Sequence, residues 1–537
     1  MVPAWQRGNE YVCYDQPVRS TEVQPRINAL GITSSMRLRV ALWLFTALNC
    51  FYLLTSSGRV RTLDEYTTFY ETESLVLRHS TAIPQAVTLH NFYGKYDIHG
   101  RPQPAYPPGH ALAASPWYAL GFYALTRMRG VPPDANDLVL AFSSCLSSAT
   151  FAALALAFAF LLLTRVGTDL KSSLFAVLIV GLGTPLFPYS AWFFSEPLST
   201  AMLMAAALLL FGRPAADPIP LKAALAAGAI LGLLVWVRPT HVLAIAVFLV
   251  AILIRDKRAG GRAALALTSV SGVAVLLLLA YNTAHFGNPL EFGYPAFAER
   301  GKQLNSFQTP LSVGLHGFLF SPGKSILLFA PPILLALAGI PRLWRRDRGL
   351  ATLAALLPVL YLLFFARYTQ WEGGYCFGPR YLVPAITLFC LGLGPALADG
   401  GRKTRWSAVG LLVLGMAIQC IGLATSFMED QATTGRYYDS HWTYRLSYSL
   451  IGQIHLLFHY LRTSEPARLG LGWDRWFVFL HKGGLSTSIL MAWAACMLVG
   501  LIVSLIGIRR SLKKESENRP PRMDRSSYTA DASFQQL

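Results

Sequence analysis

The feature that most constrains this chain of 537 residues is a succession of apolar runs, each close to the length that crosses a bilayer as a helix. A membrane-spanning helix needs roughly 20 apolar residues. We predict about twelve spans, near residues 40–54, 138–163, 172–191, 196–212, 221–237, 239–254, 263–281, 323–340, 350–366, 381–398, 406–426 and 485–508. Charged residues make up only 14% of the chain, whereas soluble domains carry about 25%. The sequence therefore predicts an all-α polytopic integral membrane protein.

The basic residues lie in the short links between alternate apolar runs. Cytoplasmic loops are enriched in Lys and Arg, so we expect these links on the cytoplasmic side. They are residues 165–171, 213–222, 255–262, 342–348 and 402–405, followed by the start of the tail at 509–514. Both termini are then cytoplasmic and the long links lie outside. This dispersal of the +18 formal charge argues against nucleic-acid binding, which needs a basic patch.

The order of apolar and polar segments divides the chain into tails, a transmembrane module and outer loops. Residues 1–36 read as a disordered cytoplasmic tail, and whether Met1 or Met36 is the true start stays open. A transmembrane module follows over 37–426, and its first outer loop, residues 56–137, is too long to be a simple connector. We expect interfacial helices in that loop at 64–79 and 111–123, with an ordered Gly- and Pro-rich loop at 90–110 between them. An outer loop at 427–484, a last span at 485–508 and a basic tail at 509–537 complete the chain.

Asp64 and Glu65 come just after the first span, at the predicted outer face of the membrane. A carboxylate at the mouth of a membrane-embedded cavity is suited to act as general base on a hydroxyl. An enzyme working on this face has lipid-linked activated donors at hand, with a polyprenyl phosphate as leaving group. Cations would then be needed for the phosphate. The plainer interpretation, a helix cap or a solvated acidic pair, stays open.

Six short motifs occur in order along residues 40–400 and resemble the GT-C superfamily of polyprenyl-phosphate-sugar-dependent glycosyltransferases. Its protein O-mannosyltransferase-like and aminoarabinose-transferase-like members (glycosyltransferase family 39 and related bacterial proteins) are the most similar. The motifs are Leu63-Asp64-Glu65, Phe194-Ser195-Glu196-Pro197-Leu198, Val237-Arg238-Pro239-Thr240, Phe286-Gly287-Asn288-Pro289 with Gly293-Tyr294, Phe320-Ser321-Pro322-Gly323-Lys324 and Gly378-Pro379-Arg380-Tyr381. The resemblance implies a GT-C-type fold with large extracytoplasmic loops, located in a bacterial inner membrane.

The resemblance also implies roles for particular residues. The acidic residue at the start of the first outer loop is the catalytic or acceptor-site carboxylate in that family, which maps onto Asp64, with Glu65 beside it. Basic residues on later outer loops contact the donor phosphate, for which Arg238, Lys324 and Arg380 are the candidates.

Each candidate has a structural alternative. Glu196 is either a second site carboxylate or a helix cap favoured by the dipole. Arg238 either binds phosphate or snorkels to headgroups, and its pairing with Glu196 is plausible. Lys324 favours an anionic ligand nearby, because a cation at a helix start opposes the dipole. Arg380 is a phosphate clamp or pairs with Glu372.

Three further residues are candidates for substrate binding. Tyr106 and Tyr294 have rings that stack on sugars, although interfacial aromatic belts explain most such residues. His110 suits pocket polarity or acceptor binding, or else plain loop packing. A divalent cation, Mg²⁺ or Mn²⁺, is a further expectation, held by Asp64 and Glu196.

We therefore expect a glycosyltransferase that moves a sugar from a polyprenyl-phosphate donor to a hydroxyl of a glycan, lipid or protein acceptor, with inversion. The sugar and the acceptor class stay open. One rival is a flippase or transporter for lipid-linked glycans, which would place charges or repeats near the bilayer midplane. Another is a membrane protein resembling O-antigen ligases or polymerases, which shares the donor class.

Overall fold

A computed structural model describes residues 34–127, 132–258, 260–294, 307–374, 376–424, 450–463 and 475–517. Most of the predicted N-terminal tail, the end of the C-terminal tail and much of the predicted loop 427–484 lie outside these residues. The expectation of disorder for the N-terminal tail therefore stays a prediction.

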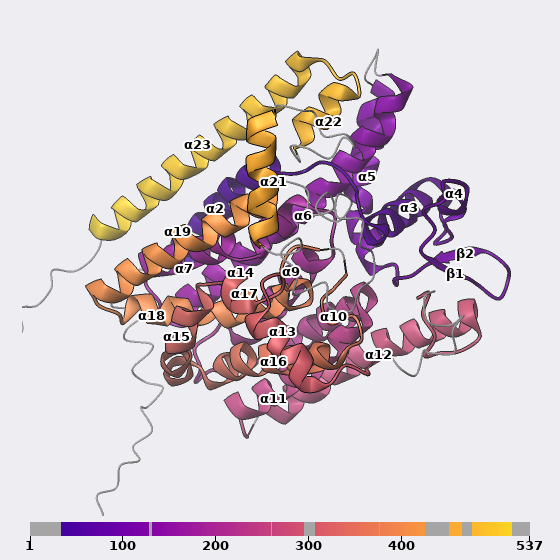
Figure 1. Ribbon diagram of the computed structural model, residues 1–537. Coiled ribbons are helices and arrows are strands. Elements are labelled where there is room, and N and C mark those ends of the chain that lie inside the picture. Colours follow the sequence, from indigo (N-terminus) through magenta and orange to yellow (C-terminus); the bar gives the residue numbers. More distant parts are fainter. Residues whose placement is uncertain are drawn as a thin grey trace, which may run out of the picture.

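The described chain is almost entirely helical, and its helices pack into one bundle (Figure 1). The first part holds α2 (Ser34–Leu54), α3 (Leu63–Arg78), α4 (Pro84–Thr88), α5 (Gly109–Arg127), α6 (Pro133–Arg165), α7 (Leu170–Gly183), α8 (Leu186–Ala191), α9 (Glu196–Phe211) and α10 (Leu221–Val237). The middle holds η2 (Pro239–His241), α11 (Val242–Arg255), α12 (Gly260–Phe286), α13 (Leu311–Phe320), α14 (Ile326–Phe329), α15 (Ile333–Arg346) and α16 (Arg348–Arg367). The last part holds η4 (Arg380–Leu382), α17 (Val383–Phe389), η5 (Cys390–Gly392), α18 (Leu393–Ala398), α19 (Arg402–Ala424), α21 (Leu450–Thr463), α22 (Trp476–Lys482) and α23 (Thr487–Glu517).

The first outer loop folds as the sequence predicts at its two ends. Helices α3 and α5 lie where the two interfacial helices are expected, and their bounds are nearly the same as predicted. Between them, a small antiparallel sheet pairs β1 (Gly94–Tyr96) with β2 (Pro102–Pro104), in register Lys95 opposite Gln103. The segment predicted as an ordered loop is therefore ordered, and it contains a short β-hairpin.

The helices confirm an all-α membrane protein. Within the described residues, seven helices are long and apolar enough to cross a membrane, and five apolar helices are shorter. The long ones cover Ser34–Leu54, Asn136–Arg165, Gly260–Phe286, Arg348–Arg367, Arg380–Ala398, Arg402–Ala424 and Thr487–Glu515. The total of about twelve spans stays a prediction, because the five shorter helices have 17 residues or fewer.

Several predicted continuous spans are interrupted. The run 172–191 forms α7 and α8, separated at Thr184 and Pro185, and the run 323–340 is divided before α15 at Pro331 and Pro332. Proline lacks the amide hydrogen of a helix interior and clashes with the preceding turn, so it ends helices that hydropathy alone extends. The run 381–398 likewise alternates between 3₁₀ and α segments. At the C-terminus, α23 covers nearly all of the predicted span 485–508 and continues beyond it to Glu517.

Loops that the basic residues assign to one membrane face contact each other. Arg165 donates a hydrogen bond of 3.0 Å to the carbonyl of Gly212, and Arg255 pairs with Asp347 at 3.4 Å. Arg346 bonds Asp399 at 2.8 Å. These contacts join the links near 165, 212, 255, 347 and 399 at one end of the bundle.

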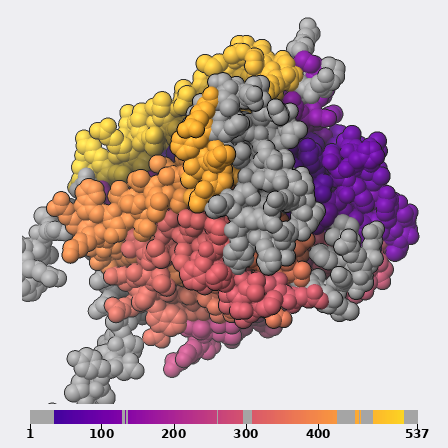
Figure 2. Space-filling view, viewed as in Figure 1, coloured from indigo at the N-terminus to yellow at the C-terminus, as the bar shows by residue number. Residues whose placement is uncertain are grey.

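Helix α2 connects this architecture to the candidate site. Its Tyr52 is buried and donates a 2.8 Å hydrogen bond to the carbonyl of Gly181, which fixes its C-terminal half against α7. A helix of this length extends about 30 Å, so Arg39 near its start and Asp64 just past its end lie at opposite ends of the bundle. Along its outer side runs α23, which forms one edge of the molecule (Figures 1 and 2).

Candidate functional site

Helix α3 begins with a capping box that fixes the position of the acidic pair. The side chain of Thr62 accepts a hydrogen bond from the amide of Glu65, and the Glu65 carboxylate accepts one from the amide of Thr62 at 3.0 Å. These reciprocal bonds satisfy amide groups that a helix start leaves without partners. Asp64 therefore lies in the first turn of α3, where the helix dipole favours a negative charge.

The carboxylate of Glu65 is occupied by structural contacts. It pairs with Arg61 at 3.4 Å and accepts a 3.1 Å hydrogen bond from the amide of Phe193, which precedes α9. Its side chain is completely buried. Glu65 thus attaches the start of α3 to the segment at Phe193. It is buried there, whereas its neighbour Asp64 is partly exposed. A catalytic role for Glu65 stays a prediction that these contacts do not favour.

Asp64, Glu196, Arg238 and Arg380 form one connected ion-pair network, which we call the charge quartet. Arg380 hydrogen-bonds Asp64 through Nη1 and Glu196 through Nε, the latter at 2.8 Å. Arg238 reaches the same Glu196 oxygen at 3.2 Å. The structure thereby places Arg380 with Asp64 and Glu196 instead of the ion pair with Glu372 that the sequence left open. The expected pairing of Arg238 with Glu196 is confirmed.

The quartet assembles because each member lies at the end of a helix. Glu196 is the first residue of α9, and Arg238 is the residue that follows α10. Arg380 opens η4 after the turn at Gly378, whose φ of +61° is a backbone conformation that side chains disfavour. A Cβ at Gly378 would also lie 2.9 Å from the Phe329 ring. The turn can therefore place Arg380 only with glycine at this position.

Asp64 is the most accessible member of the quartet. Its side chain is 23% exposed, compared with 3% for Glu196 and 4% for Arg380. Burial works to raise the pKa of Asp64, but the charge of Arg380, a hydrogen bond from Tyr106 and the bond to Arg380 outweigh it and lower the pKa below 3.8. Asp64 is therefore an ionised carboxylate with access to a ligand.

Aromatic rings cover Arg238. Its guanidinium lies 5.7 Å from the ring centre of Tyr106 and 5.8 Å from that of Tyr381, both within the range of cation–π attraction. The ring of Tyr294 meets Tyr106 edge-on at 5.4 Å. Burial raises the pKa of Tyr106, with the charge of Asp64 as the second cause, so its hydroxyl stays protonated and able to donate. The structure thus brings both predicted tyrosines to the quartet.

Lys324 is buried on the far side of the Arg380 turn. Its ammonium donates to the carbonyl oxygen of Cys376 at 2.7 Å and contacts the Cys376 sulfur at 3.1 Å. Its own amide donates to the hydroxyl of Ser321. Lys324 therefore supports the turn that presents Arg380, and it adds a positive charge behind that turn.

Two buried polar atoms beside the quartet have no hydrogen-bond partner among the described residues. They are Oε2 of Glu196 and Nε2 of His110. Burial lowers the pKa of His110 to about 3, against the attraction of the Glu196 charge, so its imidazole is neutral. Its ring lies 4.9 Å from that of Phe193. Unsatisfied buried groups cost about 1–3 kcal/mol each, and a polar ligand would satisfy them.

The carboxylates are arranged for guanidinium groups rather than for a metal ion. Arg380 occupies the space between Asp64 and Glu196, the two residues predicted to hold Mg²⁺ or Mn²⁺. Among the described residues, no group of three or more His, Cys, Asp or Glu side chains is placed to hold a metal. The donor set present does not fit the predicted cation unless Arg380 moves, so the cation stays a prediction.

Sequence reasoning named every member of the quartet but missed residues that hold it. The hydroxyl of Ser195 accepts a 2.8 Å hydrogen bond from Nε of Arg238. The ring of Phe194 lies 4.2 Å beneath the Arg380 guanidinium. Tyr381 and Cys376, described above, complete this set. Phe194, Ser195 and Tyr381 lie inside motifs quoted from the sequence, and Cys376 lies two residues before one, so closeness to a motif with a candidate charge was the available signal.

Comparisons with known proteins find similarity only at the level of solved structures. No protein-family model and no curated protein sequence matches the chain. The crystal structure of ArnT from Cupriavidus metallidurans bound to undecaprenyl phosphate is similar over 88% of this chain and 76% of that one, with 15% identity and a TM-score of 0.45. The crystal structure of the same protein in the apo state is similar over 86% of this chain and 76% of that one, with 15% identity and a TM-score of 0.44.

Proposed function

We propose that the protein is a glycosyltransferase that moves a sugar from a polyprenyl-phosphate donor to an acceptor hydroxyl, with inversion at the anomeric carbon. The observation that carries this proposal is the charge quartet. It combines one accessible carboxylate, Asp64, with two guanidinium groups at the ends of helices that otherwise lie in an apolar bundle. A base for a hydroxyl and cations for a leaving phosphate are the two requirements of this reaction.

In the proposed reaction, Asp64 accepts the proton of the acceptor hydroxyl. The hydroxyl oxygen forms a bond to the anomeric carbon from the face opposite the phosphate, and the bond from that carbon to the phosphate oxygen breaks. Its electron pair leaves with the polyprenyl phosphate, whose negative charge Arg238 and Arg380 stabilise. Nε2 of His110 and Oε2 of Glu196 bind sugar hydroxyls, which supplies the partners that these atoms lack.

The sharing of Arg380 couples donor binding to base strength. While Arg380 contacts Asp64, the pKa of Asp64 is low, and a carboxylate of low pKa is a weak base. A donor phosphate competes for the same guanidinium. When Arg380 turns toward the phosphate, the pKa of Asp64 rises and the carboxylate becomes a stronger base. The quartet thus keeps the base weak until a donor is present.

The sequence supports the remaining parts of this proposal. The alternation of basic links predicts an extracytoplasmic site and cytoplasmic termini, and the quoted motifs predict the GT-C-type fold, an inner-membrane location and a glycan, lipid or protein acceptor. The network lies at a helix end rather than at mid-helix. This favours the transferase over a flippase, whose binding residues are expected near the bilayer midplane.

The test uses cells that lack the protein, complemented with wild type, Asp64→Asn or Glu73→Gln at matched expression. Glu73 is the control, because it lies on the same helix and pairs with Arg78 at the surface. Mass spectrometry follows surface glycans and polyprenyl-phosphate-sugar pools. We expect the null and Asp64→Asn cells to lose one glycan residue and to accumulate one lipid-linked sugar, and Glu73→Gln cells to resemble wild type.

Purified proteins then test the chemical step. Removal of a general base typically costs 10²- to 10⁴-fold in rate, so we expect folded Asp64→Asn protein to lose transfer by roughly that factor, beyond the moderate loss of stability that follows from its weakened pairing with Arg380. Full restoration of both pools by Asp64→Asn would reject the proposal. Movement of the lipid-linked sugar across proteoliposomes without any acceptor would establish the flippase instead.

A further inference from the structure

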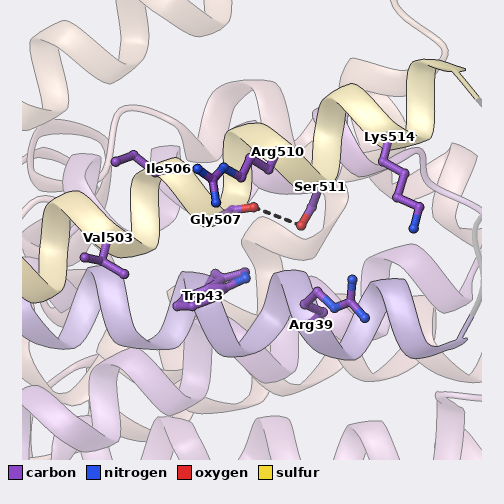
Figure 3. A pocket seen from close by; sticks show the side chains of 8 residues that line it. All are labelled: Arg39, Trp43, Val503, Ile506, Gly507, Arg510, Ser511 and Lys514. Carbon is purple, nitrogen blue, oxygen red and sulfur yellow. Dashed lines mark hydrogen bonds between the residues drawn. The ribbon is translucent and has the colours of Figure 1, made fainter.

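A second polar feature lies at the other end of α2, far from the quartet. There, α2 and α23 enclose a cavity of about 430 Å³ (Figure 3). Its walls carry Arg39 and Trp43 from α2 and six residues from α23, namely Val503, Ile506, Gly507, Arg510, Ser511 and Lys514. The cavity therefore belongs to the end of the bundle where the sequence predicts the cytoplasm.

Three cations line this cavity, and none forms an ion pair with another described residue. They are Arg39, Arg510 and Lys514, all exposed. In Figure 3, Lys514 extends from α23 toward α2, and Arg39 lies along α2 on the facing side of the cavity. The side chain of Ser511 is engaged, since its hydroxyl donates to the carbonyl of Gly507. Three unpaired cations around one cavity produce a positive potential that an anion would relieve.

The opposite part of the cavity is apolar. Val503, Ile506 and the indole ring of Trp43 form its walls. Gly507 allows this packing, because a Cβ at that position would lie 2.5 Å from the Trp43 ring. Helix α23 exposes most of its surface, with only 11% of its most apolar window buried. The cavity thus opens along an exposed apolar helix that is long enough to cross a membrane.

A second cavity, of about 610 Å³, continues the first around α23. The two share Ile506 and Arg510, and the second adds Lys171, Arg509 and Lys513. Of these cations, Lys513 lies 3.9 Å from Glu517 at an exposed position, a pairing of little strength. The positive surface therefore continues from the first cavity onto the neighbouring side of α23.

We propose that the α2–α23 cavity binds the phosphate headgroup of an anionic phospholipid from the adjacent leaflet. The cations bind the phosphate, and the apolar wall of Trp43, Val503 and Ile506 receives the start of an acyl chain. The union of both surfaces in one cavity argues for a lipid, since a free phosphate would gain nothing from the apolar wall. Basic pockets between membrane helices are suited to such headgroups.

The test measures phospholipid retention by native mass spectrometry of the full chain, purified from nanodiscs of phosphatidylglycerol and phosphatidylcholine. The variant is Arg39→Gln/Arg510→Gln/Lys514→Gln. Each basic residue near an anionic membrane contributes about fivefold in affinity, so we expect the triple change to weaken phosphatidylglycerol binding by roughly 100-fold. The matched control, Arg402→Gln/Lys403→Gln/Arg405→Gln, removes three exposed cations at the start of α19, outside both cavities.

A neutral variant separates shape from charge. Ile506 is 45% exposed, so Ile506→Trp fills the apolar wall without changing any charge or a buried contact. We expect it to weaken phosphatidylglycerol binding as well. Equal losses in the triple variant and in the α19 control would overturn the site, because attraction would then be general. Displacement of the bound anion by millimolar inorganic phosphate would overturn the assignment to a lipid.

Discussion

The charge quartet and the α2–α23 cavity use arginine in opposite ways. In the quartet, Arg238 and Arg380 are buried against two carboxylates and balance them, so the network carries no net charge. In the cavity, Arg39 and Arg510 are exposed and have no carboxylate partner among the described residues. In the quartet, ion pairs hold the guanidinium groups in place. In the cavity, the guanidinium groups are available to bind an anion.

The difference shows what each region is suited to bind. A buried network pays for its desolvation through mutual pairing, so a ligand must exchange one partner for another, and its arrival changes the remaining groups. An exposed cluster has no internal partner to lose, and its affinity follows the local anion concentration and the ionic strength. The quartet is therefore suited to a reaction, and the cavity to steady attachment.

The largest expected effect on stability separates the two regions directly. Arg380→Ala leaves Asp64 without its ion-pair partner and Glu196 with only Arg238, and removal of one member of a buried pair costs about 3–5 kcal/mol. We expect the free energy of unfolding of the detergent-solubilised protein to fall by that amount. Arg380→Lys, which retains the charge, should lose less. A change below about 1 kcal/mol for Arg380→Ala would mean that the quartet does not form in solution.

The second effect concerns the neighbouring acids of α3. Glu65→Ala removes the capping box and leaves the amide of Phe193 without a partner, so we expect a loss of about 2–3 kcal/mol. Glu65→Gln should lose less, because glutamine also serves in a capping box. Transfer per folded molecule should stay within about tenfold of wild type. A loss as large as that of Asp64→Asn in folded protein would restore Glu65 as a catalytic residue.

The third effect is the response of the quartet to acid. The pKa of Asp64 is lowered in the folded protein, so its pairing stabilises the fold fully above pH 3.8 and this contribution is lost as the pH falls through the lowered value. We expect thermal unfolding curves of wild type and Asp64→Asn to differ by a constant amount from pH 5 to 8 and to converge below pH 3.8. Convergence already at pH 5 to 6 would show that the pKa is raised instead.

The smallest effect is expected at the cavity. Arg510→Gln removes an exposed cation that has no ion pair with a described residue, and such surface changes stay within about 0.5 kcal/mol. We expect the same free energy of unfolding as wild type in detergent without phospholipid. A loss of 2 kcal/mol or more would show that Arg510 has a structural partner, and the contrast between the two regions would fail.

The sequence by itself determined the membrane class, the positions of most helices and the four members of the quartet. Apolar runs of bilayer length admit little else, and isolated charges next to such runs are conspicuous. It did not determine the interruptions at Pro185 and Pro331, where backbone chemistry overrides hydropathy, or the extension of α23 to Glu517.

Only the tertiary structure decided which charges meet. Asp64 and Arg380 are 316 positions apart, and their contact depends on the packing of the helices between them. The same packing gave Asp64 and Glu65 different surroundings, because one faces the quartet and the other caps α3 against Phe193. Neighbouring positions of a helix point in different directions, so adjacent and chemically similar residues acquire their roles from the elements that pack around them.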